Sequence, residues 1–325
     1  MKKIVFSIIA LSSLALSSKA QLSAHVEQGT SGDNTQQGNF VNIKQNTSVA
    51  NYSINAYSPF STANVAQTLD ASAVGNSINS YQFGSANYNT QTQAGSYNTI
   101  SLTQWNQVLG LIGGNGSVAY LNQGGSQNIQ SVFQHTQSTV NNDGGNLLIT
   151  NQNSSSSEIN VTQISNGAGN FASVTQSEGV TTGTIDLTQN GSDNIATLHQ
   201  VNGDLNVIHI TQTNDDAAKA GNTIDAAQYG GDSNILLIGQ AGSNNKVSTV
   251  QDGNSNFSIL AQEGDGNTAK VFQLGESNGS FIQQTGNGNT VTATQSVGNV
   301  GLTSSQIGSG NTATITQTGF IVPAI

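Results

Sequence analysis

The chain of 325 residues contains no cysteine, and proline occurs only at Pro59 and Pro323. The absence of cysteine excludes disulfide bonds, thiolate nucleophiles and cysteine-ligated metals. Charged residues are also scarce, at 7% of the chain. The fold must therefore be stabilised by burial and by hydrogen bonds between uncharged groups.

Arginine is absent, and the seven basic residues are all lysines, set against 17 acidic residues for a net charge of -10. Proteins that bind nucleic acid depend on clustered lysine and arginine to contact phosphate. The sequence therefore predicts that nucleic acid is not a partner. The excess negative charge keeps the chain soluble before it meets its partner.

The first twenty residues have the design of a secretory signal peptide. Lys2 and Lys3 precede an apolar stretch, residues 4–16, and small side chains at Ser18 and Ala20 suit signal peptidase. We expect cleavage after Ala20, which leaves a mature chain with a charge near -13. The stretch is shorter than the roughly 20 residues that span a bilayer, and no similar run follows. The mature chain is predicted to have no transmembrane segment.

Amide side chains dominate the composition, with 41 asparagines and 32 glutamines. Such a composition is typical either of a disordered prion-like tract or of an ordered amide ladder. The glutamines decide between these, because near the C-terminus they recur every eleven residues. They are Gln240, Gln251, Gln262, Gln273, Gln284, Gln295, Gln306 and Gln317. A strict short period predicts a solenoid of stacked units.

Two further residues follow the same period. Glycine stands two places after each glutamine except at Val297, and asparagine stands five places after each of the first seven except at Val300. The glycines are Gly242, Gly253, Gly264, Gly275, Gly286, Gly308 and Gly319. The asparagines are Asn245, Asn256, Asn267, Asn278, Asn289 and Asn311. Glycine, asparagine and serine between periodic segments favour tight turns.

Each unit reads as a seven-residue strand and a four-residue turn. Alternate side chains of a strand share a face, which places Asn267, Ala269, Val271 and Gln273 together. The short turn reverses the chain, so we expect consecutive strands to face each other across a thin core. The predicted fold is all-β: a β-solenoid of 11-residue strand units and 22-residue rungs in two facing parallel sheets. Roughly eleven or twelve rungs, about 50–60 Å in length, follow from the stacked-strand spacing.

This arrangement predicts two columns of glutamine. Gln240, Gln262, Gln284 and Gln306 would stack in one sheet, and the alternate four in the other. Stacked strands lie about 4.7–4.9 Å apart, so each carboxamide can donate to the next and accept from the one before. A buried amide without such partners costs roughly 1–3 kcal/mol. We expect the periodic glutamines and asparagines to form a structural amide ladder, with the periodic glycines in the turns.

The regularity of the repeat divides the chain. The signal peptide at 1–20 is followed by an irregular repeat region at 21–81 and by repeats with loop insertions at 82–239. Strictly regular repeats occupy 240–319, and 320–325 form a C-terminal tail. Upstream, Gln82, Gln93 and Gln104 keep the eleven-residue step.

The unit Gln-x-Gly-x-x-Asn-x5-Gln is complete from Gln262 to Gln273 and again from Gln306 to Gln317. It resembles the curlin repeat, and with the signal peptide it makes the chain similar to subunits of curli, the secreted amyloid fibres of Gram-negative bacteria. The resemblance implies self-polymerisation at the cell surface, export through an outer-membrane pore, and a role in biofilm matrix and adhesion. It implies a nucleator subunit as a partner, and leaves open whether this chain is the nucleator or the bulk subunit.

Other functions find less support in the residues. The four histidines, His25, His135, His199 and His209, lack companion ligands, so we expect no metal and no cofactor. The acids are scattered singly through turns without a basic partner, which argues against a polysaccharide-cleaving enzyme. The alternative that stays open is a non-polymerising secreted solenoid. It could be such an enzyme, or an adhesive or ice-binding protein that uses the outward threonines of 290–294 and 312–316.

Overall fold

The computed structural model describes residues 22–28, 40–45, 50–56, 62–67, 75–83, 87–108, 116–138, 145–177, 179–214, 216, 218–296 and 298–318. Its regular elements there are strands, in two sheets. The first sheet has 12 strands, in the order β1 (Leu22–Gln28), β3 (Ala50–Ala56), β5 (Asn76–Phe83), β7 (Thr99–Val108), β9 (Ile129–Ser138), β11 (Glu158–Ser165), β14 (Thr184–Gly191), β17 (Val207–Asn214), β19 (Ile235–Ala241), β21 (Phe257–Glu263), β23 (Gly279–Thr285) and β25 (Gly301–Ile307).

The second sheet has 14 strands, two of which lie off its main path. The main path is β2 (Phe40–Gln45), β4 (Thr62–Gln67), β6 (Tyr88–Gln93), β8 (Val118–Ser126), β10 (Leu147–Ser155), β12 (Phe171–Gln176), β15 (Ile195–Val201), β18 (Thr223–Tyr229), β20 (Lys246–Asp252), β22 (Thr268–Leu274), β24 (Thr290–Gln295) and β26 (Thr312–Gln317). The short strands β13 (Val180–Thr181) and β16 (Gly203–Asp204) pair with each other beside β10.

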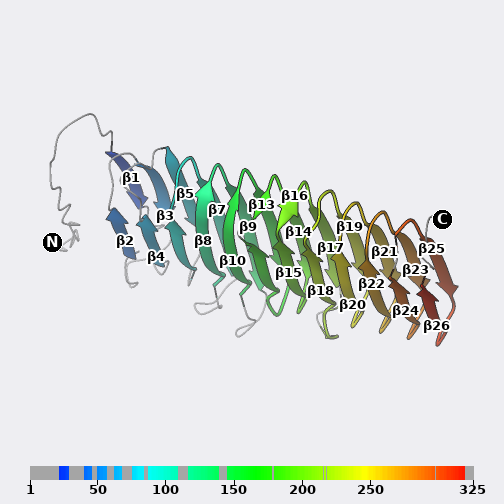
Figure 1. Ribbon diagram of the computed structural model, residues 1–325. Coiled ribbons are helices and arrows are strands. Elements are labelled where there is room, and N and C mark those ends of the chain that lie inside the picture. Colours follow the sequence, from blue (N-terminus) through cyan, green and yellow to red (C-terminus); the bar gives the residue numbers. More distant parts are fainter. Residues whose placement is uncertain are drawn as a thin grey trace, which may run out of the picture.

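Successive strands alternate between the two sheets, so each pair makes one rung of a solenoid. Figure 1 shows the rungs stacked in a single row, from β1 and β2 at one end to β25 and β26 at the other. Neighbouring strands within each sheet run parallel, and Gln240 pairs with Gln262 and Gln262 with Gln284 in register. The predicted fold class, a two-sheet parallel β-solenoid, is confirmed. Its 12-stranded sheet agrees with the predicted number of rungs.

The core is a thin layer between the sheets. Along β22 and β24 buried side chains alternate with half-buried or exposed ones, and Ala269, Val271, Val291 and Ala293 are fully buried. Fully burying one aliphatic side chain contributes about 1.5–3 kcal/mol. From Ile78 to Leu302 the buried apolar residues join one continuous cluster, because each rung covers the open side of its neighbour.

The turns need glycine for two reasons. Gly264 has a φ of 105°, a left-handed conformation that side chains disfavour. A Cβ atom there would also lie 2.3 Å from the carbonyl oxygen of Gly286 in the next rung. The close stacking of turns therefore explains why glycine recurs with the period of the repeat.

The spacing of the columns changes along the chain without breaking them. Hydrogen-bonded glutamines are 22 residues apart from Gln240 onward, whereas Gln212 and Gln240 are 28 apart. The extra residues lie in turns, as in the loop after β17.

The predicted divisions of the chain at residues 20, 81, 239 and 319 stay predictions. The described residues contain no helix that could cross a membrane.

Candidate functional site: amide columns and the open end

The glutamines of the first sheet form one hydrogen-bonded column. Each donates from Nε2 to Oε1 of the next glutamine at 2.7–3.0 Å. The members in order are Gln82, Gln104, Gln134, Gln163, Gln189, Gln212, Gln240, Gln262, Gln284 and Gln306. All donate toward the C-terminal end of the solenoid.

The second sheet has a matching column with distances of 2.8–3.0 Å. Its members are Gln93, Gln123, Gln152, Gln176, Gln200, Gln228, Gln251, Gln273, Gln295 and Gln317. The direction of donation is the same. The eight glutamines singled out from the sequence therefore lie in two columns that also run through the repeats with loop insertions.

Each glutamine also ties the two sheets together. Gln262 Nε2 donates to the main-chain oxygen of Lys246 on the facing strand at 3.2 Å, and Gln273 does the same to Phe257 at 3.0 Å. The repeat did not predict this contact, because its period describes each sheet separately. The available signal was the 16-residue offset to the first residue of the facing strand, which is constant from Gln251 to Gln317.

The asparagines act on the main chain. Asn267 accepts the backbone N–H of Asn289 at 3.0 Å and donates from Nδ2 to the oxygen of Gly286 at 2.7 Å. The other asparagines named from the sequence, except for Asn311 at the exposed end, are likewise buried where strand follows turn. They hold each turn against the next one, and some also bond to each other as the ladder predicts: Asn267 Nδ2 donates to Asn245 Oδ1 at 3.1 Å and Asn311 Nδ2 to Asn289 Oδ1 at 3.0 Å.

Within the strictly regular repeats the asparagine column is interrupted once. Val300 stands where the repeat places asparagine, and the buried Oδ1 of Asn278 one rung earlier has no hydrogen-bond partner among the described residues. Each such orphaned acceptor costs roughly 1–3 kcal/mol. The last regular rungs therefore contain a local defect.

Six of the seven turn glycines lie in the described chain with positive φ, and Gly319 lies outside it.

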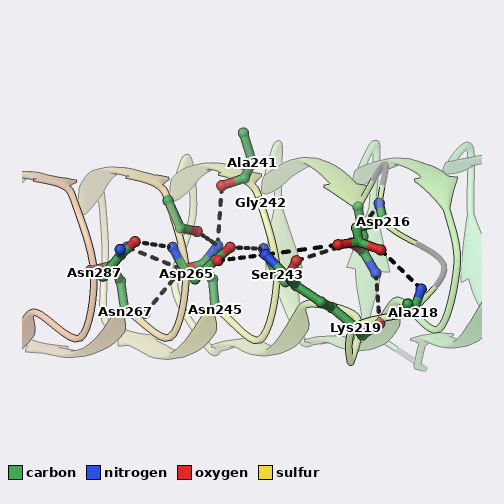
Figure 2. A network of polar contacts seen from close by, with 12 residues as sticks. Asp216, Ala218, Lys219, Ala241, Gly242, Ser243, Asn245, Asp265, Asn267 and Asn287 are labelled. Carbon is green, nitrogen blue, oxygen red and sulfur yellow. Dashed lines mark hydrogen bonds and ion pairs between the residues drawn. The ribbon is translucent and has the colours of Figure 1, made fainter.

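Beside the turn glycines, turn side chains form a third column on the surface. Figure 2 shows Asp265 accepting the N–H of Ser243 at 3.0 Å, while its own N–H donates to Asn287 at 2.9 Å. Lys219 reaches Asp265 from the loop after β17 at 2.9 Å. This hydrogen bond, and then that from Ser243, lowers the pKa of Asp265.

Among the residues that the structure describes, nothing covers the C-terminal end of the solenoid. Ala313 and Ile315 of β26 are only partly buried, although the equivalent Val291 and Ala293 one rung earlier are fully buried. β25 and β26 end the two sheets, so in the described chain their outer edges pair with no strand. The end exposes both core side chains and ladder hydrogen-bonding groups.

The histidines lie apart from one another. His209 on β17 contacts Asp186 at 3.0 Å on the outer face of the first sheet, and His199 belongs to β15 in the second sheet. Within the described ranges no three ligating side chains gather to hold a metal. The outward threonines of β24 and β26 pair in register, Thr290 with Thr312 and Thr294 with Thr316.

Comparison with known families agrees with the geometry. The sequence model of the Curlin associated repeat matches residues 242–275 and 264–296. Residues 242–296 are thus curlin associated repeats, and the resemblance predicted from the sequence is confirmed. This repeat family is structural rather than enzymatic. No curated protein matches the chain.

Proposed function

We propose that this protein is a secreted structural subunit that polymerises head to tail into extracellular, curli-like amyloid fibres. The observation that carries the proposal is the open end at β25 and β26, where Ile315 and Gln317 lie at the edge of an otherwise buried core. Covering this end would bury the same kinds of side chain that every inner rung buries. A further subunit can supply that cover.

The geometry favours an open fibre. All strands of a sheet are parallel and the glutamines donate in one direction, so the two ends of the solenoid differ. A subunit added in the same orientation continues both sheets and both glutamine columns. Heterologous addition of this kind generates filaments when the rotation does not close a ring.

The biological role follows from the fibre. The signal peptide at 1–20 would send the chain to the periplasm of a Gram-negative bacterium, and a dedicated outer-membrane pore would export it. A nucleator subunit at the cell surface would start assembly. The fibres would then serve biofilm matrix and surface adhesion.

The test is assembly of the purified mature chain. We expect fibres that bind amyloid dyes and diffract with a meridional spacing near 4.7–4.8 Å. A protein that stays monomeric at high concentration for days, or fibres without this reflection, would refute the proposal. Cells with and without the gene, compared for surface adhesion, test the biological role separately.

A further inference from the structure

One segment of the solenoid differs in composition from the rest. Between Asp70 and Asp143 the sequence has no Asp, Glu, Lys or Arg. The same segment holds seven aromatic residues, which are Tyr81, Phe83, Tyr88, Tyr97, Trp105, Tyr120 and Phe133. Exposed aromatic residues without surrounding charge are unusual on a surface that otherwise keeps a secreted acidic protein soluble.

Part of this group lies together on the outer face of the first sheet. Tyr81 on β5 pairs with Thr103 on β7, which pairs with Phe133 on β9, and Trp105 pairs with His135 in the adjacent column. The Tyr81 side chain is 36% exposed and that of Trp105 is 42% exposed. We call the surface of Tyr81, Trp105, Phe133 and His135 the aromatic platform.

Hydroxyl and amide groups border the aromatic platform. Asn79, Ser101 and Ser131 form the neighbouring outward column on the same three strands, and Thr103 lies between Tyr81 and Phe133. Tyr81 and Phe133 are two strands apart, which is about 9–10 Å at the usual strand spacing. The platform therefore combines broad apolar rings with uncharged donors and acceptors.

Aromatic rings on the platform lie close enough to contact one another. The Trp105 and His135 ring centroids are 5.5 Å apart, and those of Phe133 and His135 are 6.3 Å apart. Partial burial lowers the pKa of His135, so this imidazole is neutral at neutral pH. The only titratable histidine of the segment then adds no charge to the surface.

We propose that the aromatic platform binds uncharged polysaccharide. Pyranose rings have one face of C–H groups, which stacks on the negative face of an aromatic ring, and a rim of hydroxyls, which hydrogen-bond to amides and hydroxyls. A charged polymer would find no counter-ion here. A neutral glucan matches both the rings and the border.

The platform differs from the other apolar surface on this sheet. Phe257 and Phe281, each 40% exposed on β21 and β23, flank Ile259 and have the charged Glu263 on β21. They lack a bordering column of amide and hydroxyl groups at every strand. That surface offers a matched control, because it has aromatic rings of similar exposure on the same sheet.

The experiment measures binding of the full mature chain to insoluble cellulose and, by affinity electrophoresis, to soluble neutral β-glucan. Alginate serves as the charged comparison polymer. We expect the parent to bind both neutral glucans and not alginate. Tyr81→Ala with Trp105→Ala should weaken binding about tenfold, or about 1.4 kcal/mol, since two stacking contacts are lost. Phe257→Ala with Phe281→Ala should bind like the parent.

Several results would overturn the proposal. They are absence of glucan binding by the parent, equal loss in the control variant, or stronger binding to alginate than to glucan. A platform variant that changes lateral bundling of fibres but keeps glucan binding would assign the surface to a second copy instead. Binding is measured on fresh monomer and on fibres, with dye binding followed separately. A failure here therefore leaves the proposed polymerisation intact.

Discussion

At the scale of single residues, the repeat solves the problem of burying carboxamides, which have two donor hydrogens and an acceptor oxygen to satisfy. Gln262 uses one hydrogen for Gln284 in the next rung and the other for Lys246 across the core. Asn267 instead serves the main chain of the turns. The two amides are not interchangeable, which explains why each keeps its own place in the period.

The columns predict how glutamine substitutions act. Replacing Gln262 and Gln284 together by Leu removes two members of one column and leaves one donor hydrogen of Gln240 and Oε1 of Gln306 without a partner, at roughly 1–3 kcal/mol each. We expect a longer lag before fibres appear, measured by dye fluorescence. The control is Gln283→Leu, because this glutamine points outward on the same strand. A double variant that assembles as fast as the control would contradict a role of the ladder in nucleation.

The interruption of the asparagine column at Val300 predicts that restoring asparagine there stabilises the fold. Val300→Asn places an amide within the column, where the equivalent Asn311 donates from Nδ2 to Asn289 Oδ1 at 3.0 Å. Satisfying the orphaned Asn278 oxygen should raise the free energy of unfolding by about 1–3 kcal/mol. Denaturant titration measures this change. Val300→Ala removes the apolar side chain without supplying an amide, so a similar gain in that variant would point to another cause.

At the scale of elements, the sequence predicted the regular strands because two periods coincide in it. The side-chain period of two indicates which face of β22 is buried, and the eleven-residue period indicates where the strand stops. The short strands β13 and β16 were not predicted. A strand of two residues is too short to show a side-chain period. β13 and β16 arise because the connecting segments of successive rungs stack on one another.

The candidate site was predicted in part. The glutamine positions follow directly from the eleven-residue period of the sequence. The hydrogen bonds across the core and the uniform direction of donation depend on how the two sheets face each other. The aromatic platform has no period at all. Tyr81 and Trp105 lie on strands paired at the regular 22-residue step, and Phe133 joins them because β9 keeps the register although the step from β7 to β9 is 30 residues.

Substitutions in β26, the last strand, test whether fibres elongate at this end of the solenoid. Ile315→Lys would place a charge at the edge of the core on β26, where the next subunit has to pack. An unpaired charge resists burial in an apolar interface. We expect the variant to fold but to elongate seeds several-fold more slowly. Thr314→Lys is the control, because Thr314 points outward, and equal inhibition by both variants would rule out an interface at this end.

At the scale of the whole molecule, the number of residues between stacked glutamines is constant in one part of the chain and variable in another. From Gln240 to Gln317 each added strand meets a matching glutamine 22 residues away and a strand with at least one inward apolar side chain. Upstream the same columns continue through turns of different length. Uniform rungs let contacts accumulate early, whereas longer loops add ordering entropy before the next contact forms.

This difference predicts where assembly starts. A fragment of residues 240–325 should form fibres with a shorter lag than a fragment of residues 21–82, because a nucleus of a few matched strands recovers its conformational entropy sooner. Dye fluorescence at equal molar concentration measures both lags, and seeding each fragment with fibres of the other tests whether the registers are compatible. Scrambling residues 240–325 at constant composition provides the control for amide content. Equal lags for the two natural fragments, or a scrambled fragment as fast as the regular one, would show that register does not govern nucleation.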